Sequence, residues 1–147
     1  MPRHINAAGL QIIKDAESLR LKAYPDPGTG DVPWTIGWGS TIPVVHKGDV
    51  ITLDEAKQRL VNDVAKFEPG VERLAPVATD NQYGALVSFA FNCGIGNLEE
   101  STLLRLHRAG KYADAAAQFG KWSHANGKIL PGLVKRRAAE AALYAKP

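Results

Sequence analysis

Apolar side chains recur at three- and four-residue steps near the start of the chain. Leu10, Ile13 and Ala16 follow this spacing, and Asn6 ahead of them is a residue type that caps helix N-termini. The pattern predicts an amphipathic helix from residue 7 to about residue 17, with Glu17 in its last turn.

The pattern then changes to that of a small β structure. From Arg20 onward, polar and apolar residues alternate. Residues 25–30 follow, where proline and glycine are dense enough to indicate a turn. Residues 33–45 are rich in aromatic and β-branched types, which favour strands. We therefore predict a small antiparallel hairpin sheet over residues 33–45, weakened by its glycines and by Pro43.

Helical spacing returns after residue 51. Thr52 and Glu55 form a capping box, in which each side chain can accept a hydrogen bond from the other residue's backbone N–H. A second box, Thr79 with Gln82, opens a helix that runs through Cys93 and stops at the glycines that follow. The pattern predicts further helices over residues 53–67, 101–109, 111–120 and 133–145.

The order of these elements is helix, small sheet, long helix and helical bundle, which is typical of the α+β class. We expect a single domain, residues 1–147, in which a small β lobe at about 18–50 carries the active-site loop. The connecting helix is expected at 52–67, and the larger helical lobe at about 1–17 and 68–147. Two lobes joined in this way make a cleft, and clefts are preferred places for an extended substrate.

Composition narrows the class of protein without selecting a partner. The 147 residues are 45% hydrophobic and 22% charged, as in globular proteins, and the formal charge of +3 suits a polyanionic partner. The single cysteine, Cys93, excludes an internal disulfide and lies in an apolar run, so we interpret it as a small core residue and not a nucleophile. The sequence shows neither a signal peptide nor an apolar run long enough for a membrane span.

Several kinds of chemistry have no motif in this sequence. The four histidines lack metal-ligand spacing and there is no second cysteine, so we expect no metal site and no cofactor. Neither a nucleophile elbow nor a phosphate-binding glycine loop is present, and no nucleic-acid-binding motif is recognisable. The histidines are His4, His46, His107 and His124.

A pair of carboxylates remains as the candidate chemistry. Glu17 closes the first helix, and Asp26 lies beyond a reversal of the chain that can bring it back across from Glu17. Two carboxyl groups facing one gap are what cleavage of a glycosidic bond requires, one protonated and one ionised. By itself the pair is only suggestive, because most such pairs are solvated surface charges.

Four separated blocks of sequence resemble the phage-type lysozymes of glycoside hydrolase family 24. The first two are residues 17–26, ESLRLKAYPD, and residues 34–39, WTIGWG. The others are residues 81–94, NQYGALVSFAFNCG, and the C-terminal run 131–140, PGLVKRRAAE. The resemblance covers nearly the whole chain in order. It implies a lysozyme-like fold and cleavage of the β-1,4 bond between N-acetylmuramic acid and N-acetylglucosamine.

The resemblance also implies roles for individual residues. Glu17 matches the catalytic acid, Asp26 the second carboxylate, and Thr35 the hydroxyl that helps to hold the attacking water. The loop between Asp26 and Thr35 contains a rival acid, Asp31, but the spacing and context of Asp26 fit the family better. Ser40 stands where many members have histidine, which we expect to affect local stability more than chemistry.

Three further side chains are candidates for substrate binding. Asn92 matches a position where the family places an amide in its cleft, with a buried or capping amide as the alternative. Trp34 and Trp38 flank Thr35 and could stack on sugar rings, with core packing as the favoured alternative. The basic run of residues 135–137 is interpreted as a solvated helix face.

The sequence therefore predicts a phage endolysin that hydrolyses bacterial peptidoglycan to lyse the host. Because the sequence shows no export signal or anchor, we expect no stable membrane insertion. We also expect a monomer. It would be made in the host cytoplasm and would reach the periplasmic wall once a holin opens the membrane. Two alternatives stay open: a lytic transglycosylase, for which Asp26 and Thr35 are dispensable, and a binding protein without activity, recognising the wall or nucleic acid.

Overall fold

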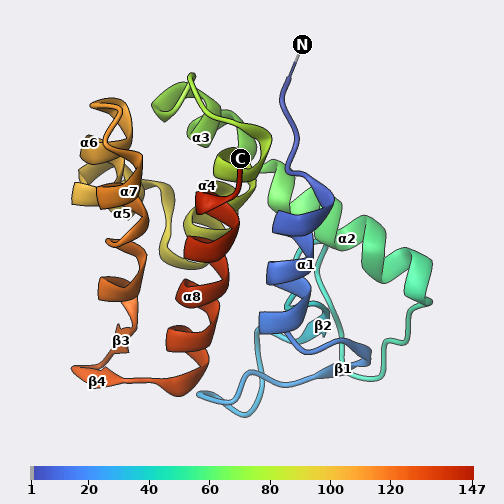
Figure 1. Cartoon of the computed structure of the whole chain (residues 1–147). Helices are drawn as coiled ribbons and strands as arrows, with labels where there is room; N and C mark the ends of the chain where they lie inside the picture. The colour runs from blue at the N-terminus through green and yellow to red at the C-terminus, as the bar shows by residue number, and fades with distance from the viewer. Residues whose placement is uncertain (1) are drawn as a thin grey trace. The chain divides into compact units, whose positions relative to one another are not determined.

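A computed structural model describes residues 2–147 of the chain (Figure 1). Contacts between Cα atoms divide the chain into two compact units. The sheet unit is Glu17–Lys66, and the helical unit combines the chain up to Ala16 with Phe67–Pro147. Within residues 2–147, every helix is too short or too polar to cross a membrane.

The sheet unit contains strand β1, Arg20–Tyr24, strand β2, Thr35–Gly37, and helix α2, Leu53–Ala65. β1 and β2 pair antiparallel, with Arg20 opposite Gly37 and Tyr24 opposite Thr35, and the register shifts between these two pairs. The chain between the strands is the loop of residues 25–34, which contains both Asp26 and Asp31.

The predicted hairpin over residues 33–45 is wrong in its pairing. Only Thr35–Gly37 forms a strand, and its partner is β1. Beyond it the chain reverses at once, because Gly37 and Gly39 have positive φ angles of 67° and 79° and Ser40 bridges back to Ile36. A strand cannot continue through two left-handed glycines.

Apolar side chains of the sheet unit form a small core. Ala23, Ile36 and Val45 are buried together, with Trp34 and Ile51 packed partly against them. Helix α2 packs on β2 and buries one side, at positions four residues apart: Ala56, Leu60 and Val64. Its predicted capping box is confirmed, since the backbone N–H of Glu55 donates to Thr52 Oγ1 and that of Thr52 to Glu55 Oε1, both at 3.1 Å.

The helical unit has eight α-helical or 3₁₀ elements and a short hairpin among the described residues. The helices are α1 (Ala7–Ala16), α3 (Glu68–Leu74), α4 (Asp80–Cys93), α5 (Ile95–Glu100), α6 (Thr102–Arg108), α7 (Tyr112–Ala116), η1 (Phe119–Trp122) and α8 (Pro131–Ala145). The hairpin consists of β3 (His124–Ala125) and β4 (Lys128–Ile129). The sequence predicts α1, α4, α6 and α8 well, but it misses α3, α5 and the hairpin.

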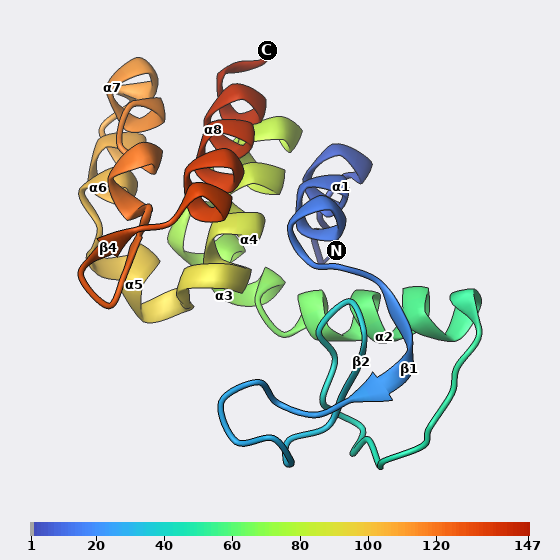
Figure 2. The same ribbon diagram turned by 90° about the horizontal axis from the view of Figure 1, so that it is seen from below.

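Helix α4 is the centre of the helical unit, and α1 and α8 both pack along it (Figures 1 and 2). Its residues Gln82–Ala90 are buried without interruption, as expected for a helix enclosed on all sides. The axes of α1 and α4 approach closely at Gly9 and Gly84, where a Cβ on Gly9 would lie 2.8 Å from the Gly84 backbone. Larger residues at this crossing would force the two helices apart.

The predicted solvated face at residues 135–137 is wrong for two of its three residues. Arg136 is 5% exposed and Arg137 is fully buried, packed around the buried carboxylate of Glu140. Arg137 Nε lies 2.6 Å from Glu140 Oε1, and Ser88 Oγ donates to Glu140 Oε2 at 2.6 Å. These arginines neutralise a core carboxylate and are not available to the solvent.

Candidate active site

Glu17 lies one residue beyond the end of α1, at a bend that leads into β1, and is partly exposed. Its carboxylate lies against the backbone of Gly39: a Cβ added to Gly39 would be 3.2 Å from Glu17 Oε2. Gly39 also has a φ angle of 79°, which other residues rarely adopt. The carboxylate of Glu17 therefore lies against main-chain atoms of the turn after β2.

Tyr24, near the end of β1, lies within the electrostatic reach of Glu17. Burial raises the pKa of the Tyr24 phenol, and the negative charge of Glu17 raises it further. The guanidinium of Arg20 stacks 4.8 Å from the centre of the Tyr24 ring and acts in the opposite direction on that pKa. Strand β1 thus provides an aromatic ring within the electrostatic reach of Glu17, with a cation stacked on that ring.

Asp26 opens the loop between the strands and is anchored by backbone groups. Its Oδ2 accepts hydrogen bonds from the backbone N–H groups of Gly28, at 3.0 Å, and Thr29, at 3.1 Å. Its own backbone is tied to the far side of the loop, since its N–H donates to Asp31 O and its carbonyl accepts from Gly30 N. Among residues 2–147, Oδ1 makes no hydrogen bond, so one oxygen of an oriented carboxylate is left for a ligand or water.

Asp31, the rival acid, has a different role in the loop. Its Oδ1 accepts a hydrogen bond from the indole Nε1 of Trp34 at 2.8 Å, and the aspartate is exposed. This bond holds the half-buried Trp34 ring at the start of β2. The two acidic residues of the loop are therefore bonded to different partners, Asp26 to backbone and Asp31 to an aromatic side chain.

Thr35 lies opposite Tyr24 in the strand pair, at the same end of the ladder as Asp26. It is half-buried, and its hydroxyl donates to the carbonyl of Pro33 at 3.3 Å. The oxygen of that hydroxyl keeps its lone pairs, so it can accept a hydrogen bond from a water.

Five of the six candidate residues lie within the sheet unit, between Glu17 and Trp38. Trp38 is only 8% exposed and Trp34 is half-buried, so both contribute to the packing of this unit. Asn92 belongs to the helical unit, where it is exposed near the end of α4, and its Oδ1 accepts the Cys93 thiol at 3.7 Å. Burial raises the pKa of that thiol, which disfavours the reactive thiolate.

Sequence reasoning missed two features of the site. Gly39 was part of a quoted motif, but its contact with Glu17 required the fold. The bond from Trp34 to Asp31 was also missed, although their three-residue separation in a tight loop is a local signal. Among the described residues, no cluster of three histidine, cysteine or acidic side chains could hold a metal ion.

Comparisons with known proteins agree with one another. The family model described as phage lysozyme matches residues 14–140. An endolysin of Bacillus phage B103 is 44% identical over 142 residues, covering 96% of this chain but 54% of that protein. The chain thus spans about half the length of this relative. An endolysin of Acyrthosiphon pisum secondary endosymbiont phage 1 is also 44% identical, over 96% of this chain and 97% of its own length.

A solved structure extends the likeness to the fold. The muramidase domain of SpmX from Asticaccaulis excentricus superposes with a TM-score of 0.87 at 35% identity, covering 99% of each chain. The lysozyme-like α+β fold expected from the sequence is therefore confirmed.

Proposed function

This chain belongs to the phage lysozyme family, and we propose that it is a phage endolysin with muramidase activity, cleaving the β-1,4 bond between N-acetylmuramic acid and N-acetylglucosamine. One observation carries this proposal. The sheet unit holds two carboxylates at opposite ends of β1, Glu17 against the backbone of Gly39 and Asp26 in a backbone-anchored turn. The name of the SpmX domain supports the choice of bond.

In this proposal Glu17 is the general acid. It donates its proton to the glycosidic oxygen as the bond to the anomeric carbon breaks. A water held by Asp26 Oδ1 and the Thr35 hydroxyl attacks that carbon and gives its proton to Asp26. The fixed orientation of Asp26 supports this role because the base needs no reorganisation when the water is activated.

Substrate contacts are proposed for Trp34, Trp38 and Asn92. Trp34 is the best supported of the three, since it is partly exposed and held by Asp31 beside Thr35. We also propose the single-domain organisation expected from the sequence: a β lobe at about 18–50, a helix at 52–67, and a helical lobe of about 1–17 and 68–147.

The biological setting is part of the proposal. The enzyme would act as a monomer on the peptidoglycan of the host, lysing the cell after a holin has opened the inner membrane. Holin dependence would be contradicted by lysis of cells that express the protein alone.

The deciding experiment is mass analysis of the fragments released from purified peptidoglycan. Hydrolysis predicts fragments with reducing N-acetylmuramic acid ends, whereas a lytic transglycosylase releases anhydro ends that lack one water. A wall-binding protein releases nothing. The matched variant is Glu17→Gln, which keeps the size and polarity of the side chain but cannot act as the acid, and we expect a loss of at least about a hundredfold in rate.

A further inference from the structure

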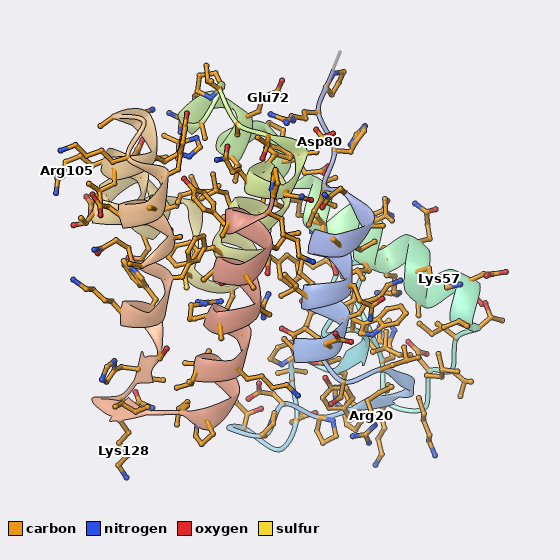
Figure 3. The ribbon with its side chains drawn as sticks, in the orientation of Figure 1. Arg20, Lys57, Glu72, Asp80, Arg105 and Lys128 are labelled. Carbon is orange, nitrogen blue, oxygen red and sulfur yellow. The ribbon has the colours of Figure 1, made fainter. Side chains whose placement is uncertain are left out.

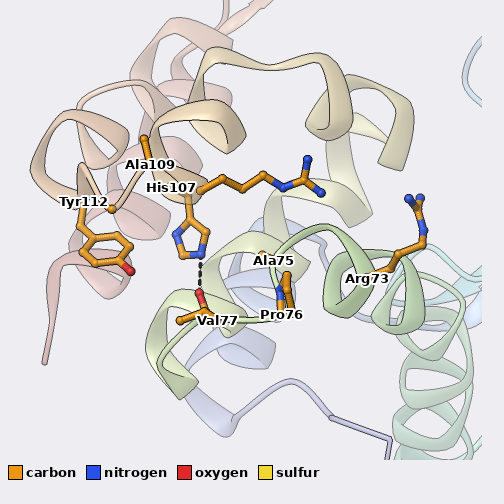
Figure 4. Close-up of a pocket in the computed structure, with 9 residues that line it drawn as sticks. Arg73, Ala75, Pro76, Val77, His107, Ala109 and Tyr112 are labelled. Atoms are coloured by element: carbon orange, nitrogen blue, oxygen red, sulfur yellow. Dashed lines mark hydrogen bonds between the residues drawn. The ribbon is translucent and has the colours of Figure 1, made fainter.

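A pocket of about 450 Å³ lies in the helical unit, and none of the residues assigned above lines it (Figure 4). It is formed by the end of α3 with the loop that follows, and by the end of α6 with the turn that leads to α7. In Figure 4, Arg73 and Tyr112 lie toward opposite ends of this pocket.

The floor of the pocket is fixed by a buried histidine. His107 is 3% exposed, with Nε2 at 2.8 Å from the carbonyl of Val77 and Nδ1 at 2.6 Å from the Tyr144 hydroxyl. A carbonyl only accepts, so Nε2 donates and Nδ1 accepts the Tyr144 proton. Burial lowers the pKa of His107, so the ring is neutral with both nitrogens occupied. It therefore shapes the pocket but leaves no ring nitrogen for a ligand.

Two arginines supply the charge. Arg108 Nε donates to the carbonyl of Leu74 at 2.7 Å, which fixes the plane of the guanidinium. Within the described chain, its terminal nitrogens make no hydrogen bond or ion pair. Arg73 pairs with Glu99 at 3.6 Å, but both side chains are about half exposed or more, and an exposed pair of this kind is weak enough to exchange its partner.

The remaining lining is apolar or aromatic. No acidic side chain lines the pocket, and Pro76, Val77 and the 41% exposed ring of Tyr112 form its walls. The Tyr112 ring packs at a tilt against the His107 ring, with 5.3 Å between ring centres, and this contact helps to hold the Tyr112 ring in place. Positive charge beside an aromatic wall suits a ligand with an anionic group on a small organic body.

We propose that this pocket binds a phosphate ester, with the phosphate on Arg108 and Arg73 and the organic part against Tyr112. The two guanidiniums come from different helices, α6 and α3. A phosphate monoester has three non-bridging oxygens that point in different directions and can accept from both arginines. A planar carboxylate has only two oxygens, and a single bidentate arginine already occupies both. The ester comes either from a small molecule or from a phosphate-containing polymer of the bacterial envelope, and the site does not depend on glycan cleavage.

Titration of the intact protein with glycerol phosphate, followed by calorimetry and by NMR shifts, tests the proposal. We expect binding that moves the resonances of Tyr112 and Ala109, and acetate should bind at least about tenfold more weakly. Arg108→Gln and, separately, Arg73→Gln should each weaken binding about tenfold or more. Arg73 is exposed, so its replacement leaves the fold intact even if Arg108→Gln lowers stability.

The matched control is Arg105→Gln, which removes the same charge from the same helix. Figure 3 shows Arg105 projecting from α6, and it does not line the pocket. Binding by this variant should stay within about twofold of the wild type. An equal loss in Arg105→Gln, or equal affinity for acetate, would overturn the proposal in favour of unspecific attraction.

A second titration with a glycerol-phosphate oligomer distinguishes the two sources. Tighter binding of the oligomer than of the monomer, lost in Arg73→Gln, identifies the polymer. Equal binding identifies a small ester. The absence of binding to both would refute the site.

Discussion

The carboxylate of Glu17 lies against the backbone of Gly39, and strand β1, a loop and strand β2 separate the two residues in the sequence. An added Cβ at Gly39 would lie 3.2 Å from Glu17 Oε2, closer than ordinary van der Waals contact. We expect this contact to make Gly39 a positioning residue for the proposed acid, Glu17.

Gly39→Ala should reduce activity by about tenfold or more, because small displacements of a catalytic group are costly. It should also cost about 1–2 kcal/mol of folding stability for an alanine at positive φ. The control is Gly127→Ala, where φ is 76° but nothing lies within 4 Å of an added Cβ. It carries the same backbone cost and should retain activity. Comparable turnover of the two variants would remove Gly39 from its positioning role.

The two acids of the loop should respond differently to amide substitution. Asp26→Asn keeps an oxygen to accept from Gly28 and Thr29, so the loop should persist while activity falls by about a hundredfold or more. Asp31→Asn likewise keeps an acceptor for Trp34 Nε1, and activity should stay within a few-fold of the wild type. Initial rates on purified peptidoglycan, with circular dichroism as a check on folding, decide between them. The reverse ranking would transfer the role to Asp31.

Thr35→Ala tests the use of water. The hydroxyl donates only one long bond, to Pro33, so its loss should cost no more than about 1 kcal/mol of stability. Turnover should nevertheless fall strongly, and Thr35→Ser, which keeps the hydroxyl, should recover much of it. Retained activity in Thr35→Ala, with anhydro products, would favour the transglycosylase alternative.

His107 should make folding stability depend on pH. Burial lowers its pKa from the ordinary 6.5, so the folded state favours the neutral ring and the unfolded state binds the proton first. The stabilisation is complete above pH 6.5 and is lost as the pH falls through the lower, folded pKa. Urea unfolding between pH 7.5 and pH 5 should show this loss.

His107→Gln removes the titration and serves as the comparison for that measurement. It should be less stable at pH 7.5, since Tyr144 and Val77 lose a partner, at a cost of about 1–3 kcal/mol. Its stability should then change less with pH over the same range. An unchanged pH dependence in this variant would assign the effect to another group.

Features that rest on near neighbours in sequence could be predicted. Both capping boxes join residues three apart, Thr52 with Glu55 and Thr79 with Gln82, and both are present as expected. The short helices were harder. Gly94 was interpreted as the stop of the preceding helix, but α5 begins directly after it, and α3 has Pro69 in its first turn. The Asn126-Gly127 turn between β3 and β4 was a readable hairpin signal that was missed.

The sequence by itself determined the fold class, the main helices and the family, because periodicity, caps and ordered motifs are properties of the chain alone. The tertiary structure decided which strand pairs with Thr35–Gly37, and it buried Arg136 and Arg137 around Glu140. It also brought Gly39 against Glu17 and joined the ends of α3 and α6 into one pocket. These features depend on contacts between distant segments, and whether a charged residue is solvated or neutralised depends on partners that only packing supplies.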